Sequence, residues 1–403
     1  TDEDALFLIA RQKGLDFVTG TKHGYSNTGY FLLSQVVRRV TGQPLSEFAT
    51  RRLLHPLGMT SSSYLDDHTR IIPRKASAYS PKRDGGFRID ASNWEQTGDG
   101  GLQTTVLDLA KWDANFYDPK LGGQGLVAEL QTPGSLSSGR ALKYALGLRV
   151  DEYRGLARVA HGGSWAGFRA QLLRFPQERF SAIVLCNLST AGPAALATKV
   201  AELYLNGRML PAEKLPEPTS AAVSSTEIEL WSGLYWNRET DDLLRIRGET
   251  GKLLARHGDG PERELLALGG GRFVRKDDPE SRVLFSRGRG RSLRLENDEE
   301  AWTYEAVQEV SPTPAALAGY TGHYYSEELD SHYVLLLEKD RLRLRRRGSE
   351  TSTLRPVFAD AFWDPEGAGL LRFIRSGPRR VTGFEVAAGS SKIPFGRVAE
   401  EGR

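Results

Sequence analysis

Residues 157–205 decide the fold of the first half of the chain, and they read ARVAHGGSWAGFRAQLLRFPQERFSAIVLCNLSTAGPAALATKVAELYL. Three apolar runs, 157–160, 168–175 and 180–188, have the length and the β-branched and aromatic content of strands. The four residues PQER join the last two runs, which indicates a hairpin and therefore an antiparallel sheet. A helical pattern follows over 193–205. The stretch predicts a domain in which helices pack on an antiparallel sheet.

The residues before this stretch carry the patterns of three helices. Apolar side chains recur at helical spacing over residues 30–40, and the pattern stops at Gly42. A shorter helix is predicted for 44–54, and Thr105 opens a third helix with the spacing of a capping box. We therefore assign residues 1–207 to one domain of the α+β or α/β class, an antiparallel sheet flanked by helices.

The composition excludes several classes of protein. The 403 residues include 54 Lys and Arg against 51 Asp and Glu, a net charge of +3, which gives no field strong enough to gather nucleic acid. The single cysteine, Cys186, excludes an internal disulfide and a cysteine-based zinc site, and we expect it in a buried strand. The sequence has no run of about 18 apolar residues, so we expect no membrane span.

The second half of the chain has the pattern of a repeated all-β module. Residues 208–225 are rich in Pro, Glu, Ala and Ser and predict a linker. After it, WSGLY at 231–235 is echoed 89 residues later by YTGHY at 320–324. Short alternating runs between turn residues indicate antiparallel strands, and about 85 residues suit one small barrel. We predict two barrels, at 226–310 and 311–403.

Two segments in the first domain carry side chains or backbone suited to chemistry. Tyr25 and Asn27 stand at the start of the first long helix, where a phenol and an amide could act as a base and a substrate clamp. Asn27 could equally well cap the helix. Residues 98–105 form a glycine-rich loop without the Gly-Lys-Ser/Thr of a phosphate loop, so a plain turn is the simpler interpretation.

A third segment, His161-Gly162-Gly163-Ser164, ends a predicted strand. The two glycines beside the histidine would let another group approach the strand backbone closely. Ser164 does not fit a nucleophile elbow, because Ala166 replaces the last glycine of Gly-x-Ser-x-Gly and a strand follows where that motif needs a helix.

Together and in this order, these segments resemble the superfamily of serine β-lactamases, penicillin-binding proteins and D-aminopeptidases, specifically its class C-like branch. Residues 20–30 match the tyrosine-x-asparagine motif with its flanks, and 55–59 match a proline-leucine-glycine-methionine stretch. Gly100 and Gly101 match the glycine-rich loop, and His161-Gly162-Gly163 stands in the place of the lysine-threonine-glycine triad. The repeat after residue 226 resembles the paired lipocalin-like barrels of some D-aminopeptidase-type members.

The resemblance implies a β-lactamase-like domain followed by two lipocalin-like barrels. It also implies a serine hydrolase that forms an acyl-enzyme with an amide or ester bond of a small molecule or peptide. Tyr25 would transfer the proton, Asn27 would hold the substrate amide, and His161 would face the scissile bond. The backbone N–H of Ser164 would be an oxyanion donor. Four glycines would line the substrate site: Gly100, Gly101, Gly162 and Gly163.

One part of that chemistry has no counterpart in the sequence. The family's nucleophile and activating lysine form Ser-x-x-Lys upstream of the tyrosine motif, but no serine here has a lysine three residues on, and 24 residues precede Tyr25. We therefore expect an incomplete domain, truncated before Ser-x-x-Lys, and a chain that is inactive alone. The missing part would lie upstream or on a complementary N-terminal chain. The alternative is a non-catalytic ligand-binding relative of the penicillin-binding proteins.

The histidine at position 161 bears on the choice of substrate. β-Lactamases of the family hold a lysine there, whereas an imidazole, with a usual pKa of about 6.5, is mostly neutral at pH 7 and suits a carboxylate less well. We therefore rank a D-amino-acid peptidase or esterase above a β-lactamase. The seven histidines show no metal-ligand spacing, so we expect no metal and no cofactor. The resemblance favours a periplasmic or secreted bacterial protein, and a homo-oligomer is compatible with it.

Overall fold

The structure is a computed structural model that describes residues 1–82, 85–211, 222–288, 290–296, 301–346, 351–378, 380–388 and 391–399. The chain divides into two compact units. Unit 1 comprises Thr1–Ile9 and Phe17–Glu213, and unit 2 comprises Ala10–Asp16 and Lys214–Arg403. Residues 212–221 of the predicted linker lie outside the described residues. Within the described ranges, no helix is both long enough and apolar enough to cross a membrane.

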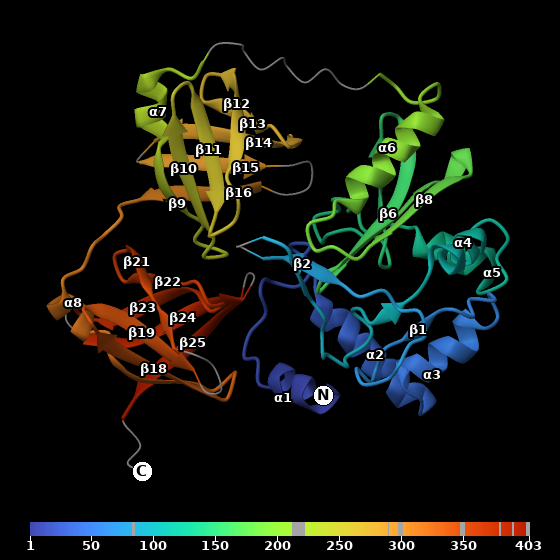
Figure 1. Cartoon of the computed structure of the whole chain (residues 1–403), viewed down its shortest axis with the longest axis horizontal. Helices are drawn as coiled ribbons and strands as arrows, with labels where there is room; N and C mark the ends of the chain where they lie inside the picture. Colours follow the sequence, from blue (N-terminus) through green and yellow to red (C-terminus); the bar gives the residue numbers. More distant parts are fainter. Residues whose placement is uncertain are drawn as a thin grey trace. The chain divides into compact units, whose positions relative to one another are not determined.

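The centre of unit 1 is a four-stranded antiparallel sheet with its strands in chain order (Figure 1). The strands are β5 (Arg149–Tyr153), β6 (Leu156–Trp165), β7 (Phe168–Phe175) and β8 (Phe180–Cys186). The predicted hairpin is present, since Phe175 pairs with Phe180 across a 3₁₀ turn. Cys186 lies in a strand as expected, but it is partly exposed where burial was expected, because β8 is at the edge of this sheet.

Helices cover both faces of this sheet, as predicted. Successive residues of a strand point to opposite faces. On one face, Ala160 packs with Ala197 and Ala201 of the last helix of the unit, and on the other face Val159 packs with Phe116 and Val127. The helices are α4 (Val106–Ala114), α5 (Gly123–Leu130) and α6 (Pro193–Leu205).

The predicted helices at 30–40 and 44–54 are also present. Gly42, in the left-handed conformation with φ +71°, ends the first of them. Thr105 caps α4, since its hydroxyl accepts a hydrogen bond from the N–H of Asp108. The Asp108 carboxylate accepts from Ser61 and Ser62 and not from the N–H of Thr105, so the capping box is only half formed. The elements of the first 105 residues are α1 (Asp2–Ala10), α2 (Asn27–Thr41), α3 (Leu45–Ala49), the π-helical turn η1 (Thr50–Leu54), β1 (Ser63–Tyr64), β2 (Tyr79–Pro81), β3 (Phe87–Ile89) and β4 (Leu102–Gln103).

Unit 2 contains the two predicted all-β modules. The first is a closed eight-stranded antiparallel barrel in which β9 joins β10 to β16. Its core includes Trp231, Tyr235 and Phe285, and Trp231 stacks on Phe285 at 5.0 Å. The elements are α7 (Ser225–Trp231), β9 (Gly233–Trp236), β10 (Leu243–Glu249), β11 (Lys252–His257), β12 (Arg263–Gly269), β13 (Arg272–Arg275), β14 (Asp278–Arg287), β15 (Arg291–Glu296) and β16 (Ala301–Val307).

The second module is a nearly closed sheet of nine strands in the order β20-β19-β18-β17-β25-β24-β23-β22-β21. Its core is aromatic, and Phe384 stacks on Phe395 at 4.8 Å. The elements are α8 (Pro314–Ala318), β17 (Gly322–Ser326), β18 (Ser331–Glu338), β19 (Arg341–Arg346), β20 (Ser352–Thr353), β21 (Arg355–Phe358), β22 (Ala361–Asp364), β23 (Gly369–Ser376), β24 (Arg380–Ala388) and β25 (Ser391–Val398).

The sequence repeat corresponds to a structural repeat. Tyr235 donates its hydroxyl to the carbonyl of Trp231 at 2.9 Å, and Tyr324 donates to the carbonyl of Tyr320 at 2.7 Å. Burial raises the pKa of Tyr235 and of Tyr324 to about 12. The echoed motif therefore anchors the first strand of each barrel by the same buried hydrogen bond.

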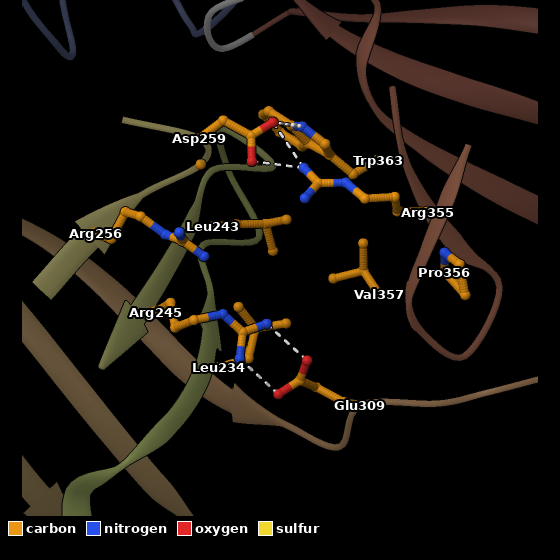
Figure 2. Close-up of a pocket in the computed structure, with 11 residues that line it drawn as sticks. Leu234, Leu243, Arg245, Arg256, Asp259, Glu309, Arg355, Pro356, Val357 and Trp363 are labelled. Atoms are coloured by element: carbon orange, nitrogen blue, oxygen red, sulfur yellow. Dashed lines mark hydrogen bonds and ion pairs between the residues drawn. The ribbon is translucent and has the colours of Figure 1, made fainter. Parts of the chain in front are cut away.

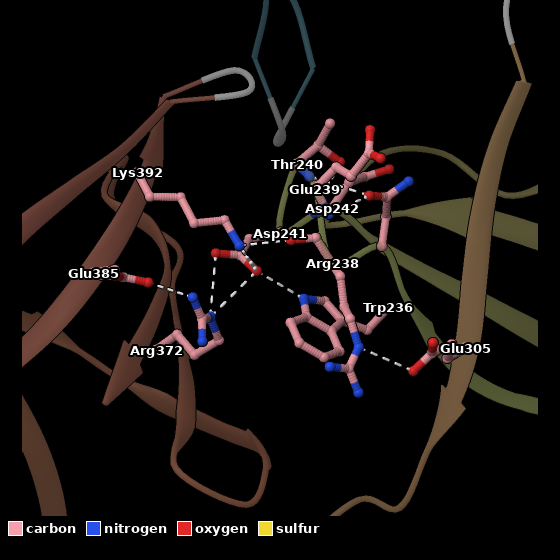
Figure 3. Close-up of polar contacts among 11 residues, drawn as sticks. Trp236, Arg238, Glu239, Thr240, Asp241, Asp242, Glu305, Arg372, Glu385 and Lys392 are labelled. Atoms are coloured by element: carbon pink, nitrogen blue, oxygen red, sulfur yellow. Dashed lines mark hydrogen bonds and ion pairs between the residues drawn. The ribbon is translucent and has the colours of Figure 1, made fainter. Parts of the chain in front are cut away.

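The two barrels of unit 2 meet at a buried carboxylate (Figure 3). Asp241 lies between β9 and β10, its side chain is 0% exposed, and it accepts a hydrogen bond from the indole N–H of Trp236 at 2.9 Å. Arg372 and Lys392 of the second barrel approach it to 3.5 and 3.4 Å. The buried apolar cluster that contains Trp236 is drawn from both barrels: Leu234, Trp236, Leu243, Val357, Ala361 and Leu370.

The second barrel has the same turn at Asp330, which stands 89 residues after Asp241. Both aspartates have a left-handed backbone, with φ +54° and +47°. Asp330 accepts from the hydroxyl of Tyr325 at 2.6 Å, but its side chain is 52% exposed. Arg11 approaches Asp330 to 3.8 Å and donates to the carbonyl of Glu327 at 2.6 Å. Residues 10–16 thus contact the Asp330 turn of the second barrel. The equivalent Asp241 turn of the first barrel instead contacts the second barrel.

Candidate active site

The second half of β6 forms an open sheet edge. β5 pairs with β6 only along residues 156–160, whereas β7 pairs with it as far as Trp165. Residues 161–165 therefore have a strand on one side and, within the part of the chain that the structure describes, none on the other. Gly162, Gly163 and Ser164 are exposed there. An exposed edge of this kind presents backbone N–H and C=O groups to an extended ligand.

The imidazole of His161 is fixed at the start of this edge. Its Nδ1 lies 2.7 Å from the carbonyl oxygen of Gly162, and its Nε2 lies 2.8 Å from the hydroxyl of Tyr144. A carbonyl can only accept, so Nδ1 carries the proton and donates it to Gly162. In the neutral ring Nε2 then accepts from Tyr144. Burial, with smaller contributions from Tyr30 and Tyr25, raises the pKa of Tyr144 to about 12, so its hydroxyl stays protonated and able to donate.

Tyr25 completes an aromatic cluster around this imidazole. Its ring centroid lies 6.3 Å from that of His161 and 6.3 Å from that of Tyr144, to which it is edge-on. Tyr25 is 63% exposed, whereas Tyr144 is partly buried. We call Tyr25, Tyr144 and His161 the aromatic triad. The phenol of Tyr25 is accessible to a ligand, whereas the phenol of Tyr144 is hydrogen-bonded to the imidazole of His161.

Asn27 lines a cavity of about 650 Å³. Ser26 caps α2, since its hydroxyl accepts from the N–H of Gly29 at 3.1 Å, and the side chain of Asn27 is therefore not needed as the cap. The indole rings of Trp94 and Trp165 meet edge-on in the lining, 5.9 Å apart. We call this cavity the indole pocket, and its volume is typical of a site for a small organic ligand.

The glycine-rich loop packs against α2. A Cβ at Gly98, where φ is +116°, would lie 2.6 Å from the carbonyl oxygen of Tyr30, so only glycine fits there. Asp99 follows and lines the indole pocket. Burial raises the pKa of Asp99, although the N–H groups of Asp99 and Gly100 act in the opposite direction. The loop thus brings a carboxyl group beside two indoles.

The predicted site residues fall into two neighbouring groups within unit 1. Tyr25 and His161 lie together in the aromatic triad, while Asn27 lines the indole pocket with Trp165, the last residue of β6. Three of the predicted residues occupy the open edge: Gly162, Gly163 and Ser164. Gly100 and Gly101 follow Asp99 but are not among the described residues that line the pocket.

Three residues of the site were missed in the sequence. Tyr144 and Trp94 stand outside every motif and outside the named strands and helices, so no local pattern marked them. Trp165 lies inside the His161–Gly167 segment, and its place within that segment was the available signal.

One group of side chains has the composition of a metal site. The ligand atoms of Asp67, His68 and Glu95 lie within 4.8 Å of one another, although Asp67 and His68 are exposed. The Nδ1 of His68 and a carboxylate oxygen of Glu95 are 2.8 Å apart. The spacing of these residues in the sequence gave no sign of the cluster, because Glu95 comes from a separate loop.

Comparison with known proteins agrees with the motifs. The family model described as Beta-lactamase matches residues 2–205, half of the chain and the part that holds the aromatic triad and the indole pocket. The chain belongs to the beta-lactamase family. The resemblance predicted from the four ordered motifs is thereby confirmed.

Relatives of this beta-lactamase family member include D-aminopeptidases. The chain is 26% identical over 337 residues to a D-aminopeptidase of Brucella anthropi, covering 83% of this chain and 60% of the relative. It is 25% identical over 333 residues to a D-aminopeptidase of Cereibacter sphaeroides, with the same coverage of 83% and 60%. The chain therefore spans about 60% of the length of these relatives.

Among solved structures, an octameric penicillin-binding protein homologue from Pyrococcus abyssi matches with a TM-score of 0.45 and 18% identity. The match covers 82% of this chain and 65% of the homologue.

Proposed function

We propose that the open edge of β6 and the aromatic triad belong to a serine hydrolase site that transfers the acyl group of an amide or ester, with D-amino-acid derivatives as preferred substrates. The observation that carries the proposal is the imidazole of His161, held by two hydrogen bonds at the start of an unpaired strand edge in a beta-lactamase family member. The D-aminopeptidases among its relatives support the choice of substrate class.

In this proposal an extended substrate lies along residues 161–165. The absence of side chains at Gly162 and Gly163 allows its backbone to approach closely. The N–H of Ser164 is an oxyanion donor, which stabilises the negative charge that develops on the scissile carbonyl. Asn27 holds the substrate amide, and the exposed phenol of Tyr25 exchanges the proton.

The hydrogen bonds of His161 support an amide or ester substrate over a β-lactam. Both nitrogens of the imidazole are engaged here, Nδ1 by Gly162 and Nε2 by Tyr144. The ring therefore has no free N–H group to offer to the carboxylate that a β-lactam carries. We therefore propose a peptidase or esterase activity and place β-lactam hydrolysis second.

The 403 residues contain no Ser-x-x-Lys motif that could supply the attacking hydroxyl. None of the serines in the 403 residues has a lysine three positions on. The serine and its activating lysine would come from sequence outside these residues, and the chain alone would bind substrate without turning it over. The second candidate, a non-catalytic ligand-binding protein, shares the site and differs only in this point.

A labelling experiment separates the two candidates. The 403-residue chain should not react with a fluorophosphonate, whereas the product of the natural gene should react if a Ser-x-x-Lys precedes Thr1. Labelling of the 403-residue chain alone would contradict the proposed source of the nucleophile. A natural gene product that binds substrate but is not labelled would establish the ligand-binding protein.

A binding experiment tests the site without the nucleophile. D-Phenylalaninamide should bind the chain more tightly than L-phenylalaninamide in ligand-observed NMR. Asn27→Ala should weaken binding of the D-enantiomer by up to about tenfold, the free energy of one hydrogen bond. Asn206→Ala, at the exposed end of α6, is the matched control and should have no effect. Equal binding by the Asn27 variant, or equal affinity for both enantiomers, would refute the site.

A further inference from the structure

A cavity of about 190 Å³ lies between the two barrels of unit 2 (Figure 2). Its apolar wall includes Leu234 and Leu243 of the first barrel and Val357 of the second. Three arginines and two carboxylates line the rest. The cavity is smaller than the roughly 300–1,000 Å³ of sites for drug-sized ligands, and it has the volume of about six waters.

Two of the three arginines are neutralised inside the cavity. Arg245 donates to both carboxylate oxygens of Glu309, at 2.8 and 2.6 Å. Arg355 donates to both oxygens of Asp259, at 2.6 and 2.7 Å, and the indole N–H of Trp363 donates to the same carboxylate at 2.8 Å. Both carboxylates are therefore satisfied by partners from within unit 2.

The third arginine, Arg256 on β11, differs, because none of the carboxylates of the described residues forms such a pair with it. Its Nε is buried, and no hydrogen-bond acceptor for it is found in the part of the chain that the structure describes. The charge of Arg256 acts on the carboxylates of Asp259 and Glu262, but both are hydrogen-bonded to other arginines, Asp259 as above and Glu262 to Arg247 at 2.9 and 2.8 Å. Figure 2 shows Arg256 and Arg355 extending into the gap from opposite sides. An unpaired buried donor of this kind is costly and calls for an acceptor.

We propose that this cavity binds a small monocarboxylate with a branched aliphatic body. The carboxylate would accept from the guanidinium of Arg256, whose planar donors match it. The aliphatic body would lie against Leu234, Leu243 and Val357. Among the residues that line the cavity, three arginines against two carboxylates leave one positive charge, which balances a monoanion. A phosphate dianion would need a second free cation and gains nothing from the apolar wall.

The test uses isovalerate as the probe and the 403-residue chain as the protein. Calorimetric titration should show binding of isovalerate, while isovaleramide, its neutral isostere, should bind at least about tenfold more weakly because it cannot form the charge-assisted hydrogen bond. This comparison needs no variant, so it stands even if a substitution impairs folding. Inorganic phosphate at equal concentration should not displace isovalerate.

Two arginine variants then locate the site. Arg256→Gln removes the charge at nearly constant length and should weaken isovalerate binding by at least about tenfold. Arg294→Gln is the matched control, because Arg294 is on the same barrel, 57% exposed and paired with Glu296, and it should bind isovalerate normally. Asn27→Ala, in unit 1, should also leave isovalerate binding unchanged, so this result is independent of the proposed catalytic site.

Three outcomes would overturn the proposal. They are no binding of isovalerate at millimolar concentration, equal binding of isovalerate and isovaleramide, and equal binding by the Arg256→Gln variant. Displacement of isovalerate by phosphate would also contradict the proposal, because it would indicate that the site binds an inorganic anion and not an aliphatic carboxylate.

Discussion

Replacing Asp241 by Asn should loosen the junction between the two barrels. The Asp241 carboxylate has no exposed surface and is held by the indole of Trp236 and by the cations Arg372 and Lys392 (Figure 3). Asn has nearly the same shape, tolerates the left-handed backbone at φ +54°, and keeps an acceptor for Trp236. The substitution therefore isolates the effect of the buried negative charge.

The expected magnitude follows from the surroundings of the two cations. Leaving one member of a buried ion pair without its partner costs about 3–5 kcal/mol. Here Arg372 keeps its ion pair with Glu385, and the side chains of Arg372 and Lys392 are 27% and 25% exposed, so solvent recovers part of that cost. We expect a loss of about 2 kcal/mol, which corresponds to a roughly 30-fold increase in the local opening equilibrium.

Hydrogen exchange measures this change at the junction itself. Peptides covering residues 234–246 should exchange faster in Asp241→Asn than in the unmodified chain. Asp330→Asn is the matched control, because Asp330 has the same backbone conformation but a side chain that is 52% exposed, and its effect should stay within about 0.5 kcal/mol. Unchanged exchange in Asp241→Asn, or an equal change in both variants, would refute this account of the junction.

Three further perturbations test other parts of the structure. Tyr144→Phe removes the hydroxyl bonded to Nε2 of His161, so the Nε2 nitrogen resonance should shift while the melting midpoint changes by no more than a few degrees; an unchanged resonance would count against the hydrogen bond. The pKa of Tyr235 is about 12 in the folded chain against about 10 unfolded, so the stability from burying its neutral phenol is present below pH 10 and lost as the pH approaches 12. The loss amounts to about 3 kcal/mol, and Tyr235→Phe should flatten the dependence of the urea midpoint on pH in this range. Gly98→Ala should lower the melting midpoint, because its Cβ would meet the α2 backbone at 2.6 Å, whereas Gly100→Ala meets open space and should not; equal midpoints would contradict the packing of the loop.

Much of the fold was predictable because its signals are local. The hairpin of β7 and β8 follows from two apolar runs and four turn residues, and the barrels follow from alternating runs and an 89-residue echo. Partial exposure of Cys186 was not predictable, since an apolar run looks the same in a central strand and in an edge strand. That distinction depends on which strands pair, which the local pattern does not encode.

The candidate site was predictable only in part. Tyr25, Asn27 and His161 are marked by neighbouring glycines or by a helix start, and Ser26 decides which residue caps α2. Tyr144 has no such marker, because its place beside His161 is produced by tertiary packing of a segment outside regular structure. Contacts of this kind become visible only when the chain is folded.

The two aspartate turns show that the barrels of unit 2 share a backbone pattern but are not interchangeable. The Asp241 turn of the first barrel holds the two barrels together, whereas the equivalent Asp330 turn of the second barrel is half exposed and contacts Arg11. The cations beside Asp241 are Arg372 and Lys392, which belong to the second barrel. The two barrels therefore contribute different groups to their contact. Two copies of the first barrel would lack these cations, and two copies of the second would lack the buried carboxylate, so neither barrel can replace the other at this contact.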